Sequence, residues 1–69
     1  MDAMEFFGKN AGRVWTSLKN SGPQTLTQLQ KSTGLTVKEV GAGLGWLAKE
    51  GKIALKNAEG LHPKFDIVD

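Results

Sequence analysis

The 69-residue sequence predicts an α+β fold in which three helices precede a small antiparallel β-sheet. Thr36 and Glu39 have the spacing of a capping box at the start of a helix, and Gly51 marks its end. Apolar residues recur at helical spacing before Gly51, whereas they alternate at every second position after it. A chain this short supports one core, so we predict a single domain over residues 1–69.

The first helix is predicted from about Met4 to Lys19. Its apolar residues recur at steps of three or four and form one face, which comprises Phe7, Ala11, Val14 and Leu18. Gly8 and Gly12 each lower helix stability by up to about 1 kcal/mol relative to alanine, or else allow close approach of another backbone. The run Asn20 to Pro23 ends the helix.

Two further helices are predicted around a tight turn. Thr27 opens the second, with Gln30 completing its capping box, and Gly34 ends it. The preceding residues 24–26 are too few for a period, and we expect them to form a short strand beside the later hairpin. The third helix runs from Thr36 to Gly51. Two helices joined by such a turn have the geometry of a helix-turn-helix.

A β-hairpin is predicted after Gly51. Residues 52–56 alternate at period two, Asn57 to Gly60 have turn composition, and a second short strand contains Phe65 and Ile67. The predicted core comprises Phe7, Ala11, Val14, Trp15, Leu18, Leu26, Leu29, Leu35, Val40, Leu44, Leu47, Ile53, Leu55, Phe65 and Ile67.

Composition argues against several classes of function. The chain has no cysteine and one histidine, His62, so we expect no zinc site and no other metal site. No constellation of nucleophile and base is present, and the glycine-rich run at 41–45 lies inside a predicted helix, so we expect no enzyme activity, no cofactor and no small-molecule ligand. Lacking a signal peptide and any long apolar run, the chain is expected to be cytoplasmic and not to bind a membrane.

Several motifs resemble a known family. They are NAGRVW near the start, GP before the second helix, STGL at the turn, and LGWLAKEGKI at the end of the third helix. With these motifs the chain resembles a small bacterial and archaeal family of stand-alone winged helix-turn-helix domains. The resemblance covers about the whole chain. It implies a three-helix bundle with a β-wing, and, through the wider superfamily, binding to DNA.

The third helix is therefore the expected DNA-contacting element. A helical wheel places Lys38, Ala42, Gly45 and Lys49 outward. Lysines give phosphate contacts but little sequence information, and glycine and alanine offer no donor to base edges. The leading hypothesis is a transcription-associated module that binds double-stranded DNA weakly and with low specificity. Its predicted contacts are Thr36, Lys38, Ala42, Lys49, Lys52 and Lys56.

An alternative hypothesis uses the same helix for protein association. Small residues at a four-residue spacing let another element come close, and an exposed tryptophan beside them is a good interface anchor. This predicts a homodimer, or a complex with another protein, through Ala42, Gly45 and Trp46. The competing interpretation is that Trp46 is covered by the first helix or the wing as part of the core.

Overall fold

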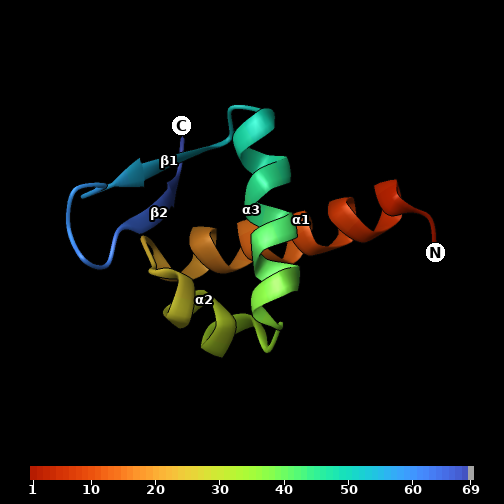
Figure 1. Cartoon of the computed structure of the whole chain (residues 1–69), viewed down its shortest axis with the longest axis horizontal. Helices are drawn as coiled ribbons and strands as arrows, with labels where there is room; N and C mark the ends of the chain where they lie inside the picture. Colours follow the sequence, from red (N-terminus) through yellow and green to blue (C-terminus); the bar gives the residue numbers. More distant parts are fainter. Residues whose placement is uncertain (69) are drawn as a thin grey trace.

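The computed structural model describes residues 1–68 and contains three helices followed by a two-stranded antiparallel sheet (Figure 1). Helix α1 spans Ala3–Ser21, α2 spans Leu26–Thr33, α3 spans Val37–Lys49, β1 spans Ile53–Lys56 and β2 spans Lys64–Ile67. Helix α3 crosses α1, α2 packs against both, and the sheet extends away from the N-terminal end of α1. The predicted α+β arrangement of a three-helix bundle and a small sheet is confirmed.

Both predicted ends of α3 are confirmed. Thr36 Oγ1 accepts a hydrogen bond from the Glu39 amide at 3.2 Å, and the Thr36 amide donates to Glu39 Oε1 at 2.9 Å. These two bonds form a capping box, which satisfies two of the amides that a helix start leaves without partners. Gly51 follows the helix with φ of 70°, a left-handed conformation that costs glycine little.

The predicted start of α2 was wrong by two residues. The N-cap is Thr25, whose capping-box partner is Gln28, whereas Thr27 lies inside the helix. The sequence contains the required spacing twice, and the earlier copy is used because Gln24 is held in extended backbone. Its amide and carbonyl form a two-bond bridge with Phe65 of β2, at 3.0 and 2.7 Å. The helix therefore begins directly after this bridge.

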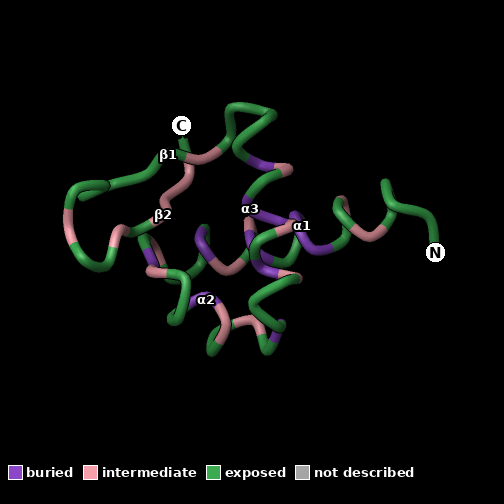
Figure 2. Tube along the Cα trace, viewed as in Figure 1, coloured by how far each residue is buried: buried purple, intermediate pink, exposed green. Residues whose placement is uncertain are grey.

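The core lies where α1, α2 and α3 meet (Figure 2). Its buried apolar residues are Ala11, Val14, Leu18, Leu29, Leu35, Val40, Leu44 and Leu47, and its partly buried neighbours are Trp15, Trp46, Ile53, Phe65 and Ile67. All of these except Trp46 were predicted. The covered interpretation of Trp46 is confirmed in part, because its side chain packs against the core but stays half-buried.

Three predicted core residues are exposed instead. Phe7, Leu26 and Leu55 have exposed fractions of 40%, 37% and 48%. Phe7 lies in the N-terminal part of α1 that extends past the crossing with α3, and Leu26 is the first residue of α2. Leu55 pairs with Phe65 across the sheet, toward the end of the wing that projects beyond the helices. Periodicity placed Phe7 and Leu55 on apolar faces, whereas Leu26 stands in a stretch too short for a period, and in the folded chain all three remain more than one third exposed.

The closest approach of two helices occurs at Gly43. A Cβ atom built there would lie 2.8 Å from the Asn10 carbonyl oxygen, so only glycine fits without movement of α1 or α3. The sequence hypothesis had given such a role to Gly8 and Gly12. It was wrong, because a Cβ at either position would meet no described atom within 4 Å. Gly43 is therefore the glycine that sets the α1–α3 distance.

Candidate nucleic-acid interface

The side of α3 that points away from α1 forms one exposed surface, which we call the α3 outer face. It comprises Val37, Lys38, Gly41, Gly45, Ala48 and Lys49, all of which are exposed. A Cβ atom at Gly41 or Gly45 would meet no described atom within 4 Å. The surface is thus smooth in its centre, with one lysine at each end and no carboxylate.

Two residues predicted for this surface lie elsewhere. Ala42 and Trp46 are half-buried on the side of α3 that faces α1, and Trp46 lines a groove with Trp15 of α1. Only Gly45 of the predicted association surface is on the α3 outer face. The helical wheel predicted the core-facing side of α3 approximately correctly. Because α1 covers one flank of α3, the exposed side of the helix lies closer to Gly41 and Ala48 than predicted.

Two of the lysines predicted to contact DNA, Lys52 and Lys56, lie on the wing side and form ion pairs. Lys52 Nζ lies 3.7 Å from Glu50 Oε1, and Lys56 Nζ lies 3.0 Å from Asp66 Oδ2. The hydrogen bond from Lys56 is the main reason that the pKa of Asp66 lies below its ordinary value. Within residues 1–68, Lys38 and Lys49 form no ion pair. They are the more available cations for phosphate contacts.

Thr36 is occupied by capping, as the sequence predicted. Its hydrogen bonds with Glu39 are the main reason that the pKa of Glu39 is lowered, with smaller contributions from the charges of Arg13 and Lys38. The Thr36 hydroxyl accepts from the Glu39 amide, and the Thr36 side chain also contributes a hydrogen bond that lowers the pKa of the Glu39 carboxyl. The Thr36 side chain is therefore engaged within the capping box.

Comparison with known proteins identifies the fold family. A family model described as winged helix-turn-helix domain (DUF2582) matches residues 1–63. The chain belongs to this winged helix-turn-helix family. No curated protein sequence matches the chain.

Two solved structures are similar to this winged-helix domain. The solution NMR structure of protein BT2368 from Bacteroides thetaiotaomicron has a TM-score of 0.81 and 28% identity, over 94% of this chain and 79% of that one. The crystal structure of the apo-Zalpha domain of zebrafish PKZ also has a TM-score of 0.81, with 19% identity over 91% of this chain and 97% of that one. The second likeness shows the fold alone. Winged helix-turn-helix domains often bind DNA, and those that do place the second helix of the motif in the major groove.

The winged-helix domain also has two grooves that the sequence hypotheses missed. One, of about 630 Å³, lies between α1 and α2 and includes Lys9, Arg13 and Thr16 in its lining. The other, of about 290 Å³, lies between α1 and α3 and includes Trp15 and Trp46. The available signal was the polar stripe of the first helix, where Lys9, Arg13 and Thr16 recur at steps of three or four. In the sequence alone this polar stripe is indistinguishable from an ordinary solvated helix face, because the groove forms only where α2 packs beside α1.

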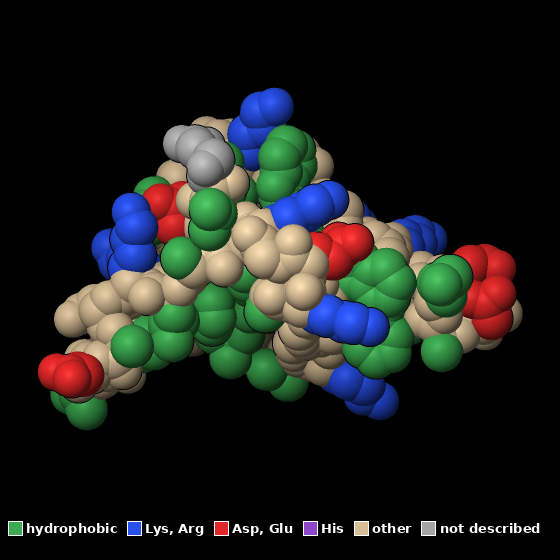
Figure 3. All heavy atoms as spheres, turned by 90° about the horizontal axis from the view of Figure 1, so that it is seen from above, with side chains coloured by type: hydrophobic (Ala, Val, Ile, Leu, Met, Phe, Trp, Pro, Cys, Tyr) green, Lys and Arg blue, Asp and Glu red, His purple; other side chains and the backbone are tan. Residues whose placement is uncertain are grey.

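Other kinds of site find little support in the described part of the chain. Among residues 1–68, no group of three or more histidine, cysteine, aspartate or glutamate side chains is placed to hold a metal ion. None of the helices there is long and apolar enough to cross a membrane. In Figure 3, lysine and arginine side chains project from several points of the surface rather than from one patch.

Proposed function

We propose that this winged-helix domain binds double-stranded DNA through the α3 outer face, weakly and with little sequence specificity, as a transcription-associated module. The observation that carries the proposal is the α3 outer face itself. It is exposed, it has Lys38 and Lys49 at its two ends, and it bears no carboxylate. The family assignment supports the choice of helix, because the winged fold presents this helix to the major groove.

The dimensions of the face match the groove. Lys38 and Lys49 are about 16 Å apart along the helix axis, at a rise of 1.5 Å per residue. The major groove of B-DNA is about 12 Å wide, so flexible lysine side chains at the two ends can reach the phosphates of opposite strands. Between them, Gly41 and Gly45 let the helix backbone come close to the groove floor.

Low specificity follows from the same residues. Base edges are read by side chains that donate or accept hydrogen bonds, and the centre of the α3 outer face has only glycine, alanine and the apolar Val37. Lys38 and Lys49 contact phosphates, which are the same for every sequence. The affinity should therefore depend strongly on salt and weakly on sequence.

The test is fluorescence anisotropy with a labelled random-sequence duplex over a series of salt concentrations. Lys38→Glu or Lys49→Glu should weaken binding, and removal of each contact should reduce the salt slope by about 1. Lys56→Glu is the control within the predicted set, because Lys56 already pairs with Asp66 and should matter less. If the duplex binds all three variants as tightly as it binds the wild type, DNA binding by α3 is wrong.

A second candidate function is self-association through the same face. It is favoured by Gly41 and Gly45, whose helix-destabilising effect is not offset by any packing within the described chain. Val37, which is 55% exposed, adds apolar area to it. Gly45→Glu should then abolish a dimer seen by sedimentation, whereas Ala42→Glu, on the half-buried flank, reports on the surface first predicted from sequence. A monomer at all accessible concentrations would exclude the homodimer.

A further inference from the structure

The positive charge of this protein is concentrated in α1 and α2. Between Glu5 and Glu39 the sequence contains no acidic residue and five basic ones, which are Lys9, Arg13, Lys19, Lys31 and Lys38. From Glu39 to the C-terminus it contains four lysines and five acidic residues, a net charge of −1. Electrostatics thus favours an anionic partner on the α1–α2 side at least as strongly as on the wing side.

The groove between α1 and α2 is lined for such a partner. Its side chains include Lys9, Arg13, Thr16 and Asn20, and no carboxylate lines it. Its floor is fixed, because the Ser17 and Ser32 hydroxyls are hydrogen-bonded at 2.7 Å. Arg13 is held by donation from Nη2 to the Thr33 carbonyl at 2.8 Å, which leaves other guanidinium N–H groups unused by that bond. The groove therefore presents fixed donors for phosphate oxygens.

The adjoining groove between α1 and α3 is aromatic. Trp15 and Trp46 both line it, and both are half-buried. Lys19 Nζ lies over the Trp15 ring, 4.9 Å from its centre, so a cation covers one face of this indole. At the rim, Glu50 is paired with Lys52, which reduces the repulsion that this carboxylate would exert on an anion.

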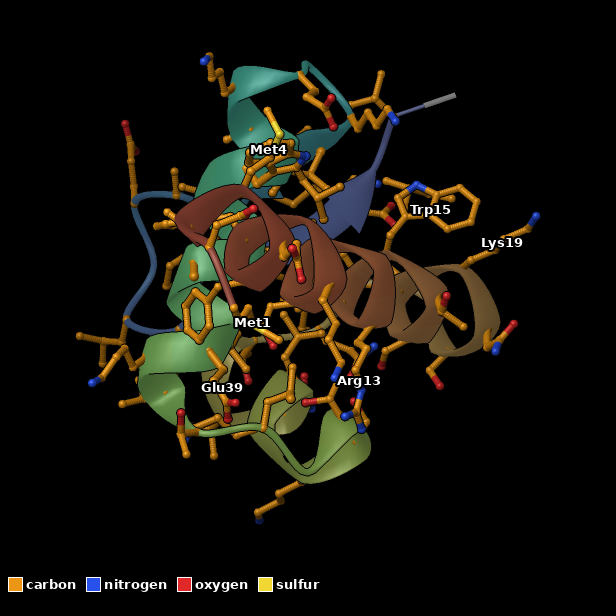
Figure 4. The ribbon with its side chains drawn as sticks, turned by 90° about the vertical axis from the view of Figure 1, so that its right-hand side faces the viewer. Met1, Met4, Arg13, Trp15, Lys19 and Glu39 are labelled. Atoms are coloured by element: carbon orange, nitrogen blue, oxygen red, sulfur yellow. The ribbon has the colours of Figure 1, made fainter. Side chains whose placement is uncertain are left out.

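Gly12 lines both grooves and joins them into one surface. We call this surface the α1 outer face, and its central residues are Lys9, Gly12, Trp15, Thr16, Lys19 and Asn20. Gly12 is exposed, with no described atom within 4 Å of a Cβ built on it. In Figure 4, Trp15 and Lys19 lie away from Glu39 and the N-terminal end of α3, whereas Arg13 lies on the side of α1 nearer to Glu39. The α1 outer face is therefore separate from the α3 outer face.

We infer that the α1 outer face binds single-stranded nucleic acid. Proteins that bind single strands combine a positively charged groove for the backbone with aromatic side chains on which bases stack. The α1 outer face has both components next to each other, and Gly12 lets a strand pass from one to the other. A duplex keeps its bases stacked inside, so it can use the cations but not the indoles. This inference is independent of duplex binding by α3.

The chain offers a direct measurement of this site. It has two tryptophans and no tyrosine, so its intrinsic fluorescence at wavelengths above about 300 nm comes from Trp15 and Trp46. Titration with oligothymidylate or oligouridylate of about 12 nucleotides should quench this emission saturably. A random-sequence duplex of the same length should quench it much less. Polyglutamate, an anion without bases, should not quench the emission, because it has no base to stack on the indoles.

Variants separate this site from the α3 outer face. A Cβ atom at Gly12 meets no described atom within 4 Å, so Gly12→Leu places its side chain in the junction of the two grooves and should weaken single-strand binding about ten-fold or more. Lys9→Gln with Lys19→Gln should weaken it and reduce its salt dependence. Lys38→Gln with Lys49→Gln, the matched control with the same charge change, should leave it unchanged.

Three results would overturn the inference. The first is the absence of quenching by either oligonucleotide at low salt. The second is equal quenching in the Gly12→Leu variant, which would place the strand elsewhere. The third is emission that changes with protein concentration alone, which would mean that a second copy of the chain covers Trp15 and Trp46. Circular dichroism confirms in each case that the variant is folded.

Discussion

The α1 outer face and the α3 outer face are both exposed helix surfaces with a glycine at their centre, but they differ in chemistry. The α3 outer face has two lysines and otherwise only glycine, alanine and valine. The α1 outer face, with the linings of its two grooves, has four cations, one carboxylate that is paired with Lys52, hydroxyl and amide groups, and two indoles. The fold family points to α3, whereas side-chain chemistry points to α1. Position in a fold and capacity for recognition are therefore separate questions.

The largest expected effect comes from exchanging charge on one face at a time. Lys9→Glu with Lys19→Glu and Lys38→Glu with Lys49→Glu each change the formal net charge from +2 to −2, because each reverses two cations. We expect each pair to weaken binding at its own face about ten-fold or more, and to affect the other ligand much less. Anisotropy with a duplex and with oligothymidylate measures both affinities. Equal losses for both ligands in both variants would mean that net charge, not position, controls binding.

The next largest effect is expected at Gly43, where α3 lies close to the backbone of α1. Gly43→Ala places a methyl group 2.8 Å from the Asn10 carbonyl oxygen, so we expect a loss of about 1–3 kcal/mol in the free energy of unfolding. Gly45→Ala, two residues away in open space, should instead gain up to about 1 kcal/mol. Urea unfolding of the two variants gives this comparison. A stabilised Gly43→Ala variant would show that α1 and α3 separate without cost.

A smaller effect tests the floor of the α1–α2 groove. Thr25→Ala removes the N-cap of α2 and should cost about 1 kcal/mol, whereas Thr27→Ala, inside the helix, should cost less. Since α2 carries Ser32 and Thr33, which line the α1–α2 groove, loss of the cap should also weaken single-strand binding more than duplex binding. Thermal unfolding and quenching titrations of both variants measure this. If Thr27→Ala is the more damaging, the start of α2 lies at the position first predicted from sequence.

The smallest effect is a difference in acid sensitivity. The pKa values of Glu39 and Asp66 lie below their ordinary values of 4.5 and 3.8, because each carboxylate accepts hydrogen bonds in the folded state. A lowered pKa contributes stability that is fully present above the ordinary value and is lost as pH falls through the folded value. We therefore expect stability to decline as pH falls below about 5.

Glu39→Gln is the matched variant for this measurement. Glutamine keeps the capping-box geometry but does not titrate, so the decline in stability below pH 4.5 should become shallower. Asp66→Asn should do the same below pH 3.8. Unfolding followed by circular dichroism across this range makes the test. Unchanged profiles in both variants would mean that other carboxylates cause the acid sensitivity.

Much of the fold could be predicted because local rules and global packing agree. The capping box at Thr36, the left-handed glycines at Gly34 and Gly51, and the stripe of Val40, Leu44 and Leu47 are all present. The predicted site fared differently. Lys38, Gly45 and Lys49 are exposed on α3 as expected, whereas Ala42 is half-buried and Lys52 and Lys56 are in ion pairs.

By itself the sequence determined the order and type of the elements, since periodicity, caps and glycines act over a few residues. Tertiary structure decided which of two adjacent capping patterns starts α2, because that depends on the pairing of Gln24 with Phe65. It also decided that Gly43, and not Gly8 or Gly12, is where two helices touch. The α1 outer face belongs to the same class. Its grooves exist only once α2 and α3 lie beside α1, and no local pattern encodes which side of α1 they leave uncovered.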